Sequence, residues 1–177
     1  MRLETMRKEI MTNTDEQSID AFATSLKNLT PLEIRSKIAQ LDSAMKQAKG
    51  SLGKDPFTLV HSFVPGMYCR EIFAPKGMLI VTQLHKTEHF VFMLRGEVSI
   101  ISEEGLQSRI KAPCMMISKV GAKRVVFTHE DTTWINVHAN PTDLNDIKEL
   151  EDIMIAKSYA ELGLEEPSVT GGVKCLG

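Results

Sequence analysis

The sequence contains few of the residues that identify secreted or disulfide-bonded proteins. Among its 177 residues there are three cysteines, Cys69, Cys114 and Cys175, which are far apart and form no Cys-x-x-Cys pair. An odd number of widely spaced cysteines does not indicate a disulfide framework. Because such frameworks are typical of oxidising compartments, the pattern favours a reducing one.

Long apolar runs and an excess of charge of one sign are also missing. No segment is apolar over the length that a bilayer requires, and the first residues, Met-Arg-Leu-Glu-Thr-Met-Arg-Lys-Glu, contain no apolar stretch typical of a signal peptide. The formal net charge of -2 gives no reason to expect a nucleic-acid partner or an acidic membrane surface. We therefore expect a cytoplasmic protein with neither a membrane nor a nucleic-acid partner.

The length of the chain and the pattern of its residues predict one main domain with helical additions. We expect an N-terminal helical extension over residues 1–50, a β-domain over 57–140, and a C-terminal helix with a flexible tail over 141–177. The first residues, up to about 14, are polar and are expected to fray. Residues 51–56 contain two glycines and a proline and are expected to form a linker.

The N-terminal extension is predicted to contain two helices, the first from Glu16 to Leu29. The second begins at a capping box, Thr30-Pro31-Leu32-Glu33, and ends at Gly50. Between these signals the apolar residues recur at spacings of three and four: Ile34, Ile38, Leu41, Met45 and Ala48. This stripe indicates a helix that packs on the main domain, and a short coiled-coil seam between subunits is the alternative.

The middle of the chain predicts about nine short strands with glycine and proline between them. The expected strands are 57–64, 67–74, 78–85, 90–95, 98–102, 106–111, 114–118, 124–129 and 132–138. No helical pattern separates them, so the sheets should be antiparallel, in a sandwich or a closed barrel.

A final helix is predicted after Asn140-Pro-Thr-Asp143, a segment that is suited to cap it. Its apolar face is expected to contain Leu144, Ile147, Leu150, Ile153 and Met154. From Gly163 onward the residues are typical of a mobile tail.

The segment Gln83-Leu-His-Lys-Thr-Glu-His89 concentrates the possible metal ligands of this chain. Side chains alternate along an extended strand, so Gln83 and His85 should share a face, and His89 begins the next strand. If the two strands pair, these three side chains can converge. The spare ligands are His129 and His138, of which His138 shares a strand face with Trp134 and Asn136.

The strand pattern and this histidine cluster together resemble the cupin superfamily. Its first motif is a glycine, His-x-His, a glutamate and a second glycine, and here Gly77 and Gly96 fit the glycines. Gln83 stands at the first histidine, His85 at the second and His89 at the glutamate. In the second motif only the glycine remains, as Gly121, with Arg124 at the histidine position and Thr128 at the asparagine position. The resemblance implies a double-stranded β-helix, a jelly-roll barrel with a site inside.

Five segments are similar to small cupin-like proteins of bacteriophage genomes that are generally described as hypothetical. These segments are Gly66–Ile72, His85–His89, Gly121–Arg124, His129–Thr132 and Val137–Asn140. This resemblance covers roughly residues 57–158. It implies a host-cytoplasmic or virion location and says little about activity.

Two functional hypotheses follow from the candidate residues. In the first, His85, His89, Gln83 and His138 hold zinc, iron, nickel or copper, and Arg124, Glu88 and Tyr68 contact a small polar or anionic molecule, with Glu88 as a possible base. In the second, the protein is a non-catalytic, phage-encoded structural or interaction protein that assembles through its helical extensions, as a homo-oligomer or with other proteins. The sequence leaves both open.

Overall fold

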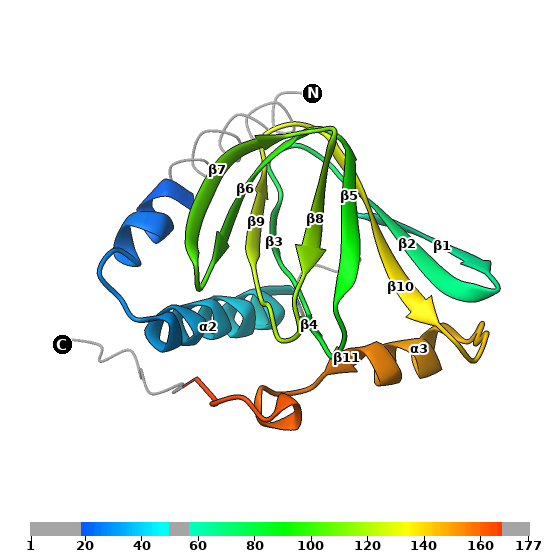
Figure 1. Ribbon diagram of the computed structural model, residues 1–177. Helices are drawn as coiled ribbons and strands as arrows, with labels where there is room; N and C mark the ends of the chain where they lie inside the picture. The colour runs from blue at the N-terminus through cyan, green and yellow to red at the C-terminus, as the bar shows by residue number, and fades with distance from the viewer. Residues whose placement is uncertain (1–18, 50–56, 168–177) are drawn as a thin grey trace.

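The protein folds into two antiparallel sheets that face each other, with helices at the outside and at one end (Figure 1). The structure is a computed structural model, and it describes residues 19–49 and 57–167. The expected N-terminal segment, the linker and the end of the tail, with Cys175, lie outside these residues.

Sheet A has five strands and sheet B has four. Sheet A is ordered β1 (Thr58–Val64), β2 (Gly66–Ala74), β10 (Thr132–Asn140), β5 (His89–Arg95) and β8 (Cys114–Ser118). Sheet B is ordered β3 (Leu79–Val81), β9 (Val125–Thr128), β6 (Glu97–Ser102) and β7 (Gly105–Lys111). A further pair joins β4 (Leu84–His85) to β11 (Ile155–Ala156). The expected fold class, a mainly β jelly-roll barrel with a few helices, is confirmed.

One core fills the space between the two sheets. Met93 from sheet A and Val98, Ile100 and Val126 from sheet B are buried there, and Trp134 packs against them. These residues occupy alternate positions along their strands, because successive side chains of a strand point to opposite faces. The inner face of sheet B is therefore apolar.

A second core covers the outer face of sheet B. The residues next to the inward-facing ones point outward, and they include Ile101, Val125 and Phe127. These side chains pack against Ile34 and Ile38 of helix α2 (Pro31–Lys49). Both helical residues are buried, with 6% and 1% of their surface exposed. This packing favours the helix laid on the domain over the subunit seam.

The start of α2 has the hydrogen bonds of a capping box. The Thr30 N–H donates to Glu33 Oε2 at 2.8 Å, and the Glu33 N–H donates to Thr30 Oγ1 at 3.3 Å. Residues 19–25 form a shorter helix before it. Ion pairs join α2 to the β-domain, from Arg35 to Glu103 and from Asp42 to Lys123.

The C-terminal helix α3 (Ile147–Met154) begins later than expected, because its cap is Asp146, whose carboxylate accepts from the Glu149 N–H at 2.9 Å. Leu150 and Met154 are buried as expected. Ile153 is 55% exposed, which corrects its assignment to the apolar face.

The tail after α3 is partly packed within the described residues. A 3₁₀ turn, η1 (Ala160–Leu162), follows α3, and Leu164 contacts the cluster of Leu84, Ala156 and Tyr159. The prediction of a mobile tail from Gly163 is therefore wrong as far as Leu164.

The strand expected over 78–85 is broken into β3 and β4. Thr82 and Gln83 lie between them, and the Thr82 N–H donates to the Arg124 carbonyl at 2.9 Å. β3 then pairs with β9, whereas β4 pairs with β11. No helix in the described part of the chain is long and apolar enough to span a membrane.

Candidate metal centre

Three histidines from three separate strands meet at one end of the barrel. His85 ends β4, His89 begins β5, and His138 lies near the end of β10. In Figure 1 these strand ends lie together beside β11 and α3. His138 points into the barrel for the reason that the sequence predicts, since it shares the inward face with Trp134 and Asn136.

The three imidazole rings are in contact with one another. The ring centroids of His85 and His89 are 4.3 Å apart, those of His89 and His138 4.2 Å, and those of His85 and His138 5.3 Å. One nitrogen from each ring lies within 4.8 Å of the other two. Two nitrogens bound to one tetrahedral zinc ion at about 2.1 Å are about 3.4 Å apart, so side-chain rotations that shorten these separations by up to about 1.4 Å would bring all three nitrogens to one ion.

These rings are buried, and several of their nitrogens have no hydrogen-bond partner. Each of the three histidines exposes 6% of its surface or less. His85 Nε2 and both ring nitrogens of His138 are buried without a partner among the described residues. An unpaired buried nitrogen costs free energy and calls for an explanation such as an ion.

His89 has the second contact that a metal-binding histidine needs. Its Nδ1 lies 3.4 Å from the Thr87 carbonyl oxygen, which can only accept, so we assign the proton to Nδ1. The lone pair of Nε2 is then free. A backbone carbonyl on the second nitrogen is the usual way to orient a ligating imidazole.

The environment keeps these imidazoles neutral. Burial lowers the pKa of His85 to about 2, and repulsion from His89 and His138 adds to it. Burial likewise lowers the pKa of His138 to about 3, with a contribution from His89. The pKa of His89 is lowered by burial as well. At neutral pH all three rings therefore offer lone pairs to a cation without first losing a proton.

Two arginines give the surroundings of the cluster a positive charge. Arg70 is buried, and its charge disfavours protonation of all three histidines. Among the described residues its Nε has no hydrogen-bond partner, and its guanidinium forms an ion pair with Glu151 at 3.7 Å. Arg124 donates to Ser118 Oγ at 2.8 Å, and burial lowers its pKa.

Tyr68 lies directly beside His138. The two residues are paired across β2 and β10, and their ring centroids are 5.9 Å apart. The Tyr68 hydroxyl is 2.7 Å from His61 Nδ1, and burial raises the pKa of Tyr68. Tyr68 thus forms a buried wall of the site.

The structure separates two of the expected site residues from the histidines. Gln83 is exposed, because the break between β3 and β4 ends the alternation that should have placed it beside His85. The condition under which Gln83, His85 and His89 were to converge, that their two strands pair with each other, is not met, since β4 pairs with β11. Glu88 is exposed to solvent, in the corner between β4 and β5.

Sequence reasoning gave little weight to Arg70 and Asn136. Both are buried, and they are paired across β2 and β10 on the same inward face as His138. The signal was present, since an arginine and an asparagine at inward positions of apolar strands need polar partners inside the barrel.

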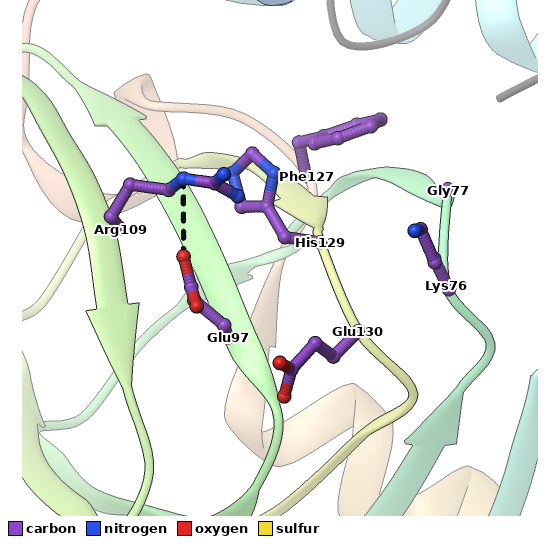
Figure 2. A pocket seen from close by; sticks show the side chains of 7 residues that line it. All are labelled: Lys76, Gly77, Glu97, Arg109, Phe127, His129 and Glu130. Atoms are coloured by element: carbon purple, nitrogen blue, oxygen red, sulfur yellow. Dashed lines mark ion pairs between the residues drawn. The ribbon is translucent and has the colours of Figure 1, made fainter. Parts of the chain in front are cut away.

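His129, the other spare ligand, lies in a different pocket. That pocket has a volume of about 230 Å³ and is lined by Lys76, Gly77, Glu97, Arg109, Phe127, His129 and Glu130 (Figure 2). His129 Nε2 is 2.7 Å from Ser99 Oγ, and Glu97 pairs with Arg109 at 3.1 Å. His129 therefore belongs to a separate polar group on sheet B.

Comparisons with known proteins returned structures only. No protein-family model and no curated protein sequence matches this chain. A cupin-2 domain containing protein from Shewanella frigidimarina has a TM-score of 0.41 and 10% identity, over 54% of this chain and 92% of that one. The EutQ protein of Clostridium difficile has a TM-score of 0.41 and 12% identity, over 49% and 69%. A salicylate 1,2-dioxygenase from Pseudaminobacter salicylatoxidans has a TM-score of 0.46 and 9% identity, over 63% and 34%.

Proposed function

We propose that the protein binds one divalent transition-metal ion through His85, His89 and His138. The observation that supports this most directly is the set of unpaired nitrogens on His85 and His138. Three neutral imidazoles that touch one another inside a barrel leave buried acceptor atoms that a cation would satisfy. No hydrogen bond within the described part of the chain satisfies these nitrogens of His85 and His138.

The ligand set suits zinc, iron, nickel or copper. Imidazole is a good ligand for each of these ions, and three protein ligands leave at least one position open for water or a substrate. Bound there, the ion would supply Lewis-acid polarisation of a substrate oxygen. Gln83 and Glu88 are not part of this set because both are exposed.

The ligand of this site is proposed to be a small anion. Three imidazoles do not neutralise a divalent cation, and Arg70 and Arg124 add positive charge in a partly buried place. An acidic molecule would offset this charge, held by charge-assisted hydrogen bonds from one or both arginines. Tyr68 would limit the size of the ligand, because its ring fills the wall beside His138.

The test is metal analysis of untagged protein after exposure to each of the four metals. We expect about one ion per chain in the wild type, and less than a tenth of that in His138→Ala and His85→Ala, since each removes one of only three ligands. Gln83→Ala is the matched control and should retain the metal. Folding is checked by circular dichroism in every variant.

Two outcomes would contradict the proposal. Wild-type protein that takes up no ion would remove it, and so would folded His138→Ala protein that keeps a full complement of metal. Loss of metal in Gln83→Ala would contradict the three-histidine set and return Gln83 to the ligands, beside the histidines, as the sequence suggested.

A second candidate function is that of a non-catalytic structural or interaction protein, encoded by a phage as the sequence resemblance suggests. Assembly through the helices finds little support, since the stripe of α2 packs on sheet B and Leu150 and Met154 of α3 pack on Tyr68. The observation in favour of assembly is an apolar surface elsewhere, on sheet A.

A further inference from the structure

The outer face of sheet A is apolar and exposed. Seven of the eleven exposed large apolar residues in the described part of the chain lie on it: Val60, Val64, Met67, Phe90, Leu94, Met115 and Ile117. Among them Met115 is 56% exposed and Phe90 47%. Single exposed apolar residues are ordinary, but a continuous patch indicates an interaction site.

Strand register shows that the patch is continuous. One row of paired residues crosses all five strands in the order Val60, Glu71, Ile135, Phe92, Met115. The next row on the same face is Ser62, Cys69, Val137, Phe90, Ile117. Neighbours within a row are about 5 Å apart, so their side chains form one surface. Of these ten residues only Glu71 is charged.

Nothing in the described chain covers this face. Helix α2 packs on sheet B, and α3 packs on Tyr68, which faces the inside of the barrel. Both ends of the five-stranded row are edge strands, β1 and β8. An exposed apolar face of this extent on a folded domain is a liability unless a partner covers it.

The arrangement of the strands is suited to a copy of the same chain. β10 is the middle strand of the sheet, with β2 and β5 on either side and β1 and β8 at the edges. A two-fold axis that lies between two such faces and runs along β10 places β2 opposite the partner's β5, and β1 opposite the partner's β8. Such an interface is isologous, which is the commonest way in which identical subunits associate.

Glu71 and Arg95 have charges of opposite sign and lie on the strands that this axis brings together. Glu71 is on β2, and Arg95 is at the end of β5, where its guanidinium lies 5.7 Å from the ring of Phe73 on the same face. With the axis along β10, each Glu71 is about one residue pair from the partner's Arg95, within reach of an arginine side chain. Two intersubunit ion pairs would result.

The size of the face is close to the smallest that specific dimers use. Five strands about 4.8 Å apart and about seven residues long, at ~3.4 Å per residue, give a face of roughly 570 Å². Two copies then bury roughly 1,150 Å², close to the lower limit of about 1,200 Å² for specific interfaces. The flat estimate omits the relief of the side chains, which adds area.

We propose that this chain forms a symmetric homodimer through the outer face of sheet A, with Ile135 and Val137 of β10 at its centre and Phe90 and Phe92 of β5 beside them. The axis runs along β10, and Glu71 of each subunit pairs with Arg95 of the other. The inference is independent of the metal site, because His85, His89 and His138 lie inside the barrel, and metal content measured in the same samples keeps the two proposals separate.

The test is the molar mass of the intact chain by size-exclusion chromatography with light scattering at micromolar concentration. We expect a dimer for the wild type and a monomer for Phe90→Glu, whose dissociation constant should rise by roughly thirtyfold or more, as for loss of a central hot-spot residue. Ile153→Glu is the matched control, because Ile153 is as exposed as Phe90 but lies on α3. It should remain a dimer.

The charge pair gives a second readout. Glu71→Arg alone and Arg95→Glu alone should each weaken the dimer, because each places like charges opposite one another, and the double swap should restore it. A wild type that is monomeric would overturn the proposal. A dimer that Phe90→Glu leaves intact would also overturn it, because the contact would then lie elsewhere.

Discussion

Sheets A and B both carry large apolar residues on their outer faces, but only the outer face of sheet B is covered by a helix of the described chain. On sheet B the outward residues Ile101, Val125 and Phe127 are buried under α2 of the same chain. On sheet A the outward residues Phe90 and Ile117 are 47% and 53% exposed. A sheet that is apolar on both faces needs another element packed on each face. For sheet B the barrel core covers the inner face and α2 covers the outer face. The difference identifies sheet A as the face that is left for a partner.

The inner faces of the two sheets differ in polarity. Sheet B turns Val98, Ile100 and Val126 into the barrel. At the end of the barrel near α3, sheet A turns His138 and Arg70 inward, with Tyr68 and Asn136. We therefore expect the contribution of sheet B to the free energy of unfolding to depend on packing. The contribution of sheet A should also depend on the protonation of its buried groups.

The largest expected effect is acid destabilisation of metal-free protein. The pKa values of His85 and His138 in the folded state, about 2 and about 3, lie below the ordinary value of 6.5. The unfolded chain therefore takes up protons first. The stabilising contribution is complete above about pH 6.5 and is lost as the pH falls toward the folded-state values. From pH 7 to pH 5 the two histidines together should cost about 4 kcal/mol of unfolding free energy.

Urea unfolding across this pH range in the presence of a chelator measures the effect. Hydrogen exchange should show β4 and β10 losing protection before β6 and β9. The variant with both His85→Gln and His138→Gln should have a much flatter pH profile. A wild-type profile as flat as that of the variant would contradict the assignment of these groups as buried and neutral.

The next largest effect contrasts a covered residue with an uncovered one. Ile38 of α2 is 1% exposed and packs on sheet B, so Ile38→Ala should cost about 3 kcal/mol of unfolding free energy through lost burial and a cavity. Phe90→Ser on sheet A should change the unfolding free energy of the monomer by less than about 0.5 kcal/mol.

Chemical denaturation at concentrations low enough to dissociate any dimer separates the two outcomes. Equal losses in the two variants would show that the outer face of sheet A is covered within a single chain.

The smallest effect concerns Gly96, the residue that joins β5 of sheet A to β6 of sheet B. Its φ is +98°, and a Cβ at this position would lie 2.7 Å from the Cα of Thr132. Gly96→Ala should therefore cost about 2 kcal/mol more than Gly105→Ala, where φ is +111° but nothing lies within 4 Å of the added atom. Thermal unfolding of the two variants measures this difference. Equal losses would mean that only backbone strain matters at Gly96.

Much of the secondary structure could be predicted from local patterns. The capping box at Thr30, the stripe through Ile34 and Ile38, and most of the strands follow from capping chemistry and from the periods of 3.6 and 2. The inward direction of His138 follows from the same alternation as that of Trp134 and Asn136. These features depend on residues that are close together in the sequence, so one sequence is enough to show them.

The candidate site could be predicted only in part. His85, His89 and His138 were all among the expected ligands, but Gln83 was expected beside them and is exposed. The error arises between β3 and β4, where Thr82 and Gln83 belong to neither strand and the alternation of side chains is interrupted. β3 pairs with β9 and β4 pairs with β11, and pairings between residues this far apart in the sequence leave no signal in the local pattern.

The sequence by itself determined which residues of this protein are able to point inward, since alternation along a strand is a property of the backbone. Only the tertiary structure decided which of them meet. His138 reaches His85 and His89 because β10 lies beside β5, and β4 is held against β11. It also decided that α2 covers sheet B rather than sheet A, because Ile34 and Ile38 pack on sheet B and the ion pairs of α2 reach Glu103, after β6, and Lys123, before β9.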